Sequence, residues 1–104
     1  MNDQMCKNEI GINTTVKLEF NLHQGAELED YQLIQLAVTQ CGEEICVKDL
    51  DDIESEDGKY FFILEAADTS KLCLGYPVRC QMAWKSGRWR NTTRVREYPV
   101  REEL

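Results

Sequence analysis

The side chains that could do chemistry in this chain are few, and their spacing forms no catalytic arrangement. His23 is the only histidine among the 104 residues, so any Ser–His or Cys–His pair would have to use it. It follows an apolar alternation and stands two residues before Gly25, and no Gly-x-Ser-x-Gly elbow accompanies it. The sequence therefore predicts a solvated turn residue at His23 and a protein that is not an enzyme.

The cysteines are the next group with chemical potential, and their spacing does not match a zinc site. No C-x2-C pair occurs, and Cys80 alternates with Val78 and Met82 as a small core residue would. An odd number of cysteines without a recognisable export signal predicts free thiols in a reducing compartment. We expect no metal and no cofactor at these positions, which are Cys6, Cys41, Cys46, Cys73 and Cys80.

An acidic run over residues 49–57 offers oxygen ligands of the kind that calcium prefers. The spacing does not match an EF-hand, and Ile53 stands where a further ligand would help. The run is therefore predicted to be a solvated acidic loop. Three of its carboxylates are predicted partner contacts, namely Asp51, Asp52 and Asp57.

Charge is divided unevenly along the chain, whose net charge is −7. Residues 1–70 carry 4 lysines against 16 acidic residues, and residues 71–104 carry 8 basic residues against 3 acidic ones. Three interpretations are open: cross-strand ion pairs within one sheet, head-to-tail contact between copies, or a nucleic-acid surface. The third is disfavoured, because a negative overall field repels phosphate and no nucleic-acid motif accompanies the arginines.

The basic C-terminal part contains the best candidate for a contact surface. Trp89 is flanked by two arginines, and tryptophan and arginine are the residues that dominate binding energy at protein interfaces. The predicted basic contact residues are Trp89, Arg88, Arg90, Arg94 and Arg96. An alternative is a sugar-stacking platform formed by Tyr76, Trp84 and Trp89, although Trp84 shares a predicted core face with Val78 and Met82.

The elements that must position these side chains are short strands, because apolar residues recur with a period of two. Strands are expected over residues 16–22, 31–40, 45–50, 59–66, 76–85 and 89–100. Residues 31–40 are also the best helix candidate, but their β-branched residues favour a strand. Turns are expected at residues 41–44, 57–58 and 86–87, and a loop or short helical turn capped by Asp68 at residues 67–70.

This pattern predicts an all-β fold, an antiparallel immunoglobulin-like β-sandwich of six or seven short strands. Residues 1–13 are expected to be a loosely ordered lead-in, and residues 14–104 a single domain. Pro99 places the end of the chain at a sheet edge. No apolar run approaches the roughly 20 residues of a membrane helix, and the first seven residues do not resemble a signal peptide, so we expect neither a membrane partner nor secretion by that route.

The segment 49–100 resembles a small β-sandwich found in structural proteins of tailed phages and prophages, and is similar to the N-terminal domain of phage baseplate upper proteins. The similar features are Lys48 to Ile53, Asp57 to Phe62, the Asp-Thr of residues 68–69 with its trailing Leu72, and Gly75 followed by the alternating strand at residues 78–84. The resemblance covers about half the chain well. The first 48 residues resemble that domain only in the spacing of their expected strands.

That resemblance implies a non-enzymatic building block of a virion, made in the bacterial cytoplasm, that packs against copies of itself or against another phage structural protein. Charge-separated faces agree with this role, since complementary charges set the register of an assembly. Two other functions remain open on the residues alone. One is a carbohydrate-binding or host-adhesion module with an exposed aromatic shelf, and the other is an intracellular binding protein that uses its acidic face.

Overall fold

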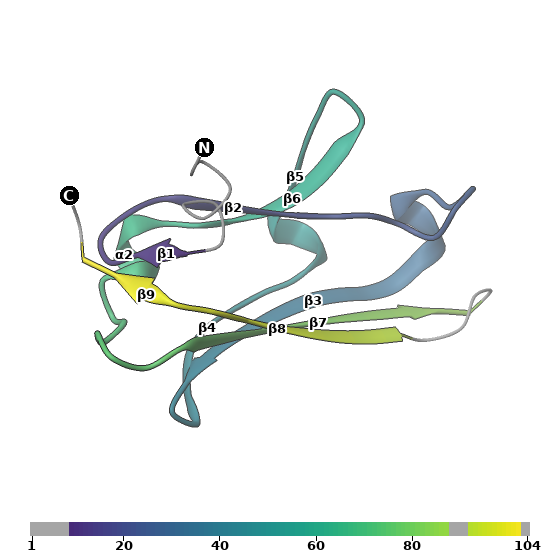
Figure 1. The fold of residues 1–104 in the computed structure, drawn as a ribbon. Coiled ribbons are helices and arrows are strands. Elements are labelled where there is room, and N and C mark those ends of the chain that lie inside the picture. Colours follow the sequence, from purple (N-terminus) through teal and green to yellow (C-terminus); the bar gives the residue numbers. More distant parts are fainter. Residues whose placement is uncertain (1–8, 88–91, 103–104) are drawn as a thin grey trace.

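Two β-sheets face each other in the computed structural model, which describes residues 9–87 and 92–102 (Figure 1). The first sheet has three strands, in the order β2 (Val16–Phe20), β6 (Lys59–Leu64) and β5 (Ile53–Glu56). The second has four, in the order β4 (Glu43–Lys48), β3 (Tyr31–Gln40), β7 (Val78–Ser86) and β8 (Thr92–Tyr98). The two ends of the described chain are joined by a short parallel pair, β1 (Ile10–Gly11) and β9 (Val100–Arg101).

The spatial order of the strands is that of the immunoglobulin sandwich. Strands β2, β6 and β5 take the places of B, E and D, and strands β4, β3, β7 and β8 those of C′, C, F and G. Every pair within these two sheets is antiparallel. Seven of the described strands have four or more residues. The predicted all-β immunoglobulin-like sandwich is therefore confirmed.

Strand β3 settles the ambiguity between helix and strand at residues 31–40. Ile34, Leu36 and Val38 are at most 1% exposed, whereas the residues between them are only half-buried. This alternation puts one face of the strand on the core, which a helix with the same sequence could not do. β3 pairs with β4 on one side and β7 on the other, so Val38 lies opposite both Cys46 and Cys80.

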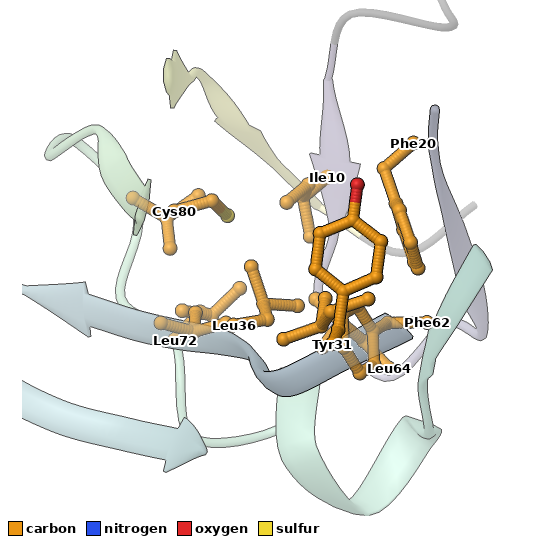
Figure 2. Packing of buried hydrophobic residues seen from close by; sticks show 11 residues of the cluster. Ile10, Phe20, Tyr31, Leu36, Phe62, Leu64, Leu72 and Cys80 are labelled. Carbon is orange, nitrogen blue, oxygen red and sulfur yellow. The ribbon is translucent and has the colours of Figure 1, made fainter. Parts of the chain in front are cut away.

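The core lies between the two sheets and is dominated by aromatic and branched side chains (Figure 2). Phe62 is fully buried, and the ring of Phe20 stacks on it with a centroid separation of 5.2 Å. Trp84 meets Phe20 edge-on at 6.4 Å. Such aromatic contacts add about 0.5–1.5 kcal/mol each beyond the burial of area. The other buried hydrophobic members of the cluster are Ile10, Tyr31, Ile34, Leu36, Val38, Leu64, Leu72, Val78 and Cys80.

Strand β6 has buried side chains on both faces. Phe62 points into the core, and Phe61 on the opposite face is only 8% exposed. The Lys17 ammonium lies 4.7 Å from the centre of the Phe61 ring and covers it by a cation–π contact. The turn before β6 is the predicted one: Asp57 and Gly58 have φ of 53° and 78°, as a two-residue hairpin turn requires.

Two sequence predictions differ from the structure. The acidic run 49–57 is not simply a loop, because it contains the 3₁₀ turn η2 (Leu50–Asp52) and the edge strand β5. Leu50 and Ile53 pack against the core, and this anchors the run to the sandwich. Ile10 was placed in a loose lead-in, yet it is 1% exposed and pairs with Val100. The part of the lead-in at residues 10–11 therefore belongs with the sandwich.

Buried polar side chains fasten the connections to the strands. The Gln40 side chain donates to the carbonyls of Cys73 and Tyr76 at 2.8 and 2.9 Å, and accepts from the Cys73 N–H at 2.8 Å. The Thr69 hydroxyl accepts from the Thr14 N–H at 3.0 Å and donates to the Thr14 carbonyl at 2.7 Å. Both side chains are at least 95% buried, so their hydrogen bonds form in a water-poor environment.

The short helix α2 (Ala66–Thr69) forms where a capped turn was predicted, and Asp68 has the capping role. Its Oδ2 accepts the Glu65 N–H at 3.0 Å and lies 3.1 Å from the ammonium of Lys48 on β4. Burial alone would raise the pKa of Asp68, but the hydrogen bond from Glu65 and the Lys48 charge outweigh it and lower the pKa. Burial opposes a raised pKa at Lys48, yet Asp68 holds that pKa above its ordinary value.

Candidate functional site

One side of the sandwich carries a cleft between the edge strands β2 and β8. We call it the edge cleft; its volume is about 370 Å³. Strand β2 pairs only with β6, and β8 only with β7, among the described residues, so a free backbone edge lies on each wall. The lining consists of Glu19, Phe20, Asn21, Leu22, His23, Tyr31, Trp84, Arg94, Arg96 and Tyr98.

The register of β8 explains why two arginines face this cleft. Arg94 lies opposite Met82, and Arg96 opposite Cys80. Residues directly opposite each other on paired strands share a face of the sheet, so both arginines are on the core side of β8. Because β8 is an edge strand, its core-side positions lie at the margin of the packed core, and both arginines are exposed. Inward-pointing charges on an edge strand exclude most strands from pairing there, and admit one that brings complementary charge.

Trp84, which lines the edge cleft, has a buried hydrogen-bond donor that is not used. Its indole Nε1 is buried and has no acceptor, the only such side-chain atom among the described residues. A buried donor without a partner costs about 1–3 kcal/mol. Sequence reasoning assigned Trp84 to the core, and the ring does pack there, against Phe20.

The edge cleft continues along the same side as a smaller hollow of about 200 Å³. Glu19, Arg96 and Tyr98 line both the edge cleft and this hollow. The hollow extends the edge cleft to Ile10 and Val16. A cleft that runs along two strand edges fits an extended peptide better than a compact small molecule.

The described lining of the edge cleft contains no serine or cysteine beside His23. The His23 N–H donates to the Tyr31 hydroxyl at 2.8 Å, and its ring Nδ1 lies 3.0 Å from the Gln24 carbonyl. His23 is exposed, as predicted for a turn residue, but its place beside the cleft was not foreseen. Nothing local to residue 23 indicates which strand of the other sheet lies across from it.

The opposite side of the sandwich is acidic. Residues 49–52 lead directly from β4 to β5, so the free edges of these two strands lie together, away from β2 and β8. We call residues 43–57 the acidic edge; they contain eight carboxylates and one lysine. Asp51, Asp52 and Asp57 are all exposed within it. Part of this acidity is structural, since Asp52 Oδ2 accepts the Asp49 N–H at 3.0 Å in a capping box.

The structure thus separates the two groups of predicted contact residues. Arg94 and Arg96 lie on the edge cleft, and the three aspartates lie on the acidic edge. The two ion pairs found among the described residues involve lysines, Lys17 with Glu56 and Lys48 with Asp68. Pairing of the arginines with acidic strands inside one sheet is therefore wrong for Arg94 and Arg96. Arg88, Trp89 and Arg90 lie outside the described residues.

The cysteines described by the structure are free and do not form a site with one another. Burial raises the pKa of Cys80 to about 12 and that of Cys46 to about 11, with a smaller contribution from Asp68 at Cys46. Such thiols stay protonated at neutral pH and are poor nucleophiles. Cys41 and Cys73 are exposed beside another hollow, which Gln40 and Tyr76 also line. Among the described residues, no group of three or more potential ligands could hold a metal ion.

Comparisons with protein-family models, with curated proteins and with solved structures find no match to this chain. Within the described ranges, no helix has the length and apolar character needed to cross a membrane. The fold and the site together define an immunoglobulin-like sandwich with a basic, aromatic cleft at one edge and an acidic edge opposite. The function must be argued from this geometry.

Proposed function

We propose that this chain is a non-enzymatic assembly protein that associates with copies of itself, or docks on a neighbouring structural protein, through the edges of its sandwich. The observation that supports this most directly is the placement of opposite charges on opposite sides. Arg94 and Arg96 lie at the edge cleft, and the carboxylates of residues 43–57 lie at the far edge. Within one chain these groups do not neutralise each other.

Opposite charges on opposite sides favour a head-to-tail contact. Such a contact is heterologous, and it closes into a ring or continues as a filament, depending on the rotation between neighbours. Electrostatic complementarity would orient the copies, while exposed apolar groups would supply affinity. Val47 and Val95 are about 40% exposed on the two edge strands of the four-stranded sheet, β4 and β8.

The assembly we propose is a phage or prophage tail or baseplate, with the chain made in the bacterial cytoplasm and built into the virion. The support is the resemblance of residues 49–100 to the N-terminal domain of baseplate upper proteins, together with the sandwich fold. The gene neighbourhood tests this directly. Adjacent tail genes support the proposal, and neighbouring genes for metabolic enzymes contradict it.

Sedimentation velocity at several salt concentrations tests the assembly itself. At low salt, the weight-average sedimentation coefficient is expected to rise with protein concentration. At 0.5 M salt the Debye length is about 4 Å, so contacts between exposed charges weaken and the coefficient is expected to fall. A chain that remains monomeric at low salt and millimolar concentration contradicts self-association.

A carbohydrate-binding or adhesion module is the second candidate, and one observation favours it. The edge cleft is lined by three aromatic side chains, those of Phe20, Trp84 and Tyr98. Trp84 is half-buried, however, and does not form the open aromatic shelf on which a sugar ring stacks. A glycan array separates the two functions. The third possibility, capture of a basic protein by the acidic edge, predicts one stoichiometric partner in a pull-down.

A further inference from the structure

The acidic edge includes a segment shaped to reach into a neighbour. Strands β5 and β6 form a hairpin whose turn end points away from the rest of the molecule (Figure 1), while β6 pairs with β2 from Tyr60 to Leu64. Its outer strand carries Glu54 and Glu56, and Asp57 is at the turn; all three are exposed. We call Ile53–Glu56 together with Asp57 and Gly58 the acidic finger.

We propose that the acidic finger of one copy docks in the edge cleft of the next, with Glu54 and Glu56 placed opposite Arg94 and Arg96. This inference rests on the proposed function and names the two surfaces that meet. It assigns a role to the edge cleft as a site for a carboxylate-bearing strand, and it identifies the occupant as a second copy of this chain.

The spacing of charges on the two strands matches. Glu54 and Glu56 are two residues apart on β5, and side chains at that spacing share one face of a strand. Arg94 and Arg96 have the same spacing on β8, and they share the face that lines the edge cleft. When two such strands lie side by side, both glutamates can stand directly opposite an arginine, the arrangement in which cross-strand charge pairs stabilise a sheet.

The backbone of both strands is available for this pairing. β5 pairs only with β6, and β8 only with β7, among the described residues. A strand added along β8 would extend the four-stranded sheet by one member through main-chain hydrogen bonds. β8 has seven residues and β5 has four, so β8 is long enough to pair with the whole of β5.

Docking would break few of the ion pairs that the isolated chain makes. Glu56 lies 3.5 Å from Lys17, but the two side chains are 67% and 58% exposed, and an ion pair in water contributes little. No ion pair of the described residues includes Arg94 or Arg96. Glu19, at the rim, opposes the docking carboxylates and must lie beside the incoming strand.

A charge-swap experiment tests the pairing. One variant, R94E/R96E, makes both the cleft and the finger acidic, and the other, E54K/E56K, makes both basic. Each alone is expected to weaken self-association about tenfold or more, because two attractive pairs become repulsive ones. Mixing the two variants restores complementary pairs at every junction, so the mixture is expected to associate again. The measurement is sedimentation velocity at low salt on full-length protein, with circular dichroism confirming the fold of each variant.

A matched control has the same change in net charge elsewhere on the sheet. R79E/K85E alters two exposed residues of β7 that the register places on the face away from the cleft. It is expected to associate as the unmodified chain does. The neutral variant R94Q/R96Q provides a second measurement, since it removes the proposed pairs without adding repulsion. In the unmodified chain, the indole resonance of Trp84, assigned with W84F, is expected to shift as protein concentration rises.

The outcomes separate this inference from the proposed function. If the unmodified chain associates while both charge variants associate equally well, the finger-to-cleft contact is overturned, and assembly through another surface stands. If the unmodified chain stays monomeric, the proposed self-assembly fails, and this contact fails with it. If the Trp84 resonance responds to an anionic oligosaccharide such as oligogalacturonate but not to protein concentration, the cleft binds carbohydrate, and the second-copy occupant is overturned.

Discussion

Replacing Gln40 by methionine should reveal how much of the stability depends on one buried amide. The substitution keeps the length of the side chain and removes all its hydrogen-bonding atoms. Three hydrogen bonds of 2.8, 2.8 and 2.9 Å to the backbone of Cys73 and Tyr76 are lost. Gln40 is 5% exposed, at the end of β3, so methionine occupies a largely apolar position there.

The magnitude follows from the number of bonds. Each intramolecular hydrogen bond contributes about 0.5–1.5 kcal/mol net, which gives about 1.5–4.5 kcal/mol for three. Cys73 and Tyr76 are themselves exposed, so water can reach part of the released backbone and the cost should lie in the middle of that range, at about 2–3 kcal/mol. For a domain of this size the midpoint of thermal unfolding should fall by roughly 10–20 °C.

The assays are thermal unfolding and amide hydrogen exchange, with Gln35→Met as the control. Gln35 is on the same strand but faces away from the core, so its replacement should change the free energy of unfolding by less than about 0.5 kcal/mol. The Cys73 amide should lose protection in the Gln40 variant only. Equal stability of the two variants, or an unchanged Cys73 amide, would refute the role given to Gln40.

Three further outcomes are expected. Phe62→Ala should cost about 3–5 kcal/mol in the free energy of unfolding, because it empties the centre of the core, and Phe62→Leu clearly less; similar denaturation midpoints for both would contradict this. The pKa of Asp68 is lowered on folding, so its contribution to stability is present above its ordinary pKa and is lost as pH falls through the lowered value. Acid denaturation of Asp68→Asn should therefore show a shallower dependence on pH, and an unchanged slope would count against the Lys48 contact. In the native chain a maleimide should label Cys41 and Cys73 rapidly, whereas Cys80 should react only on unfolding; early labelling of Cys80 would show that its burial is wrong.

The strands were predictable because their signal is local. Alternation of apolar and polar residues over 31–40 and 78–85 fixes which face is buried, and Asp57-Gly58 fixes a turn. Strand β5 was missed because only four residues, Ile-Glu-Ser-Glu, carry its pattern inside an acidic run. The position of Gln40 in the sequence did indicate that its side chain is buried. It continues the core-facing alternation of Ile34, Leu36 and Val38, so a buried amide could have been expected there.

The edge cleft was not predictable in the same way. The orientation of Arg94 and Arg96 depends on their register with β7, and one residue of slippage would turn both to the opposite face. That β2 lies across from β8 depends on how two sheets stack, which no short segment encodes. The charge asymmetry of the sequence indicated an acidic and a basic part of the chain, and the structure places residues 43–57 at one edge and Arg94 and Arg96 at the other. The charge asymmetry did not predict that the basic surface is a cleft lined by aromatic side chains.

The parallel pair of β1 and β9 has a mechanical consequence. Hydrogen bonds of 3.0 Å join the Ile10 N–H to the Pro99 carbonyl and the Ile12 N–H to the Arg101 carbonyl. Because the strands run in the same direction, tension applied between Glu9 and Glu102 pulls them lengthwise past each other and loads both bonds at once. These two strands should therefore separate in a single shearing event rather than one hydrogen bond at a time. Until they separate, the pair protects the two sheets from the applied force.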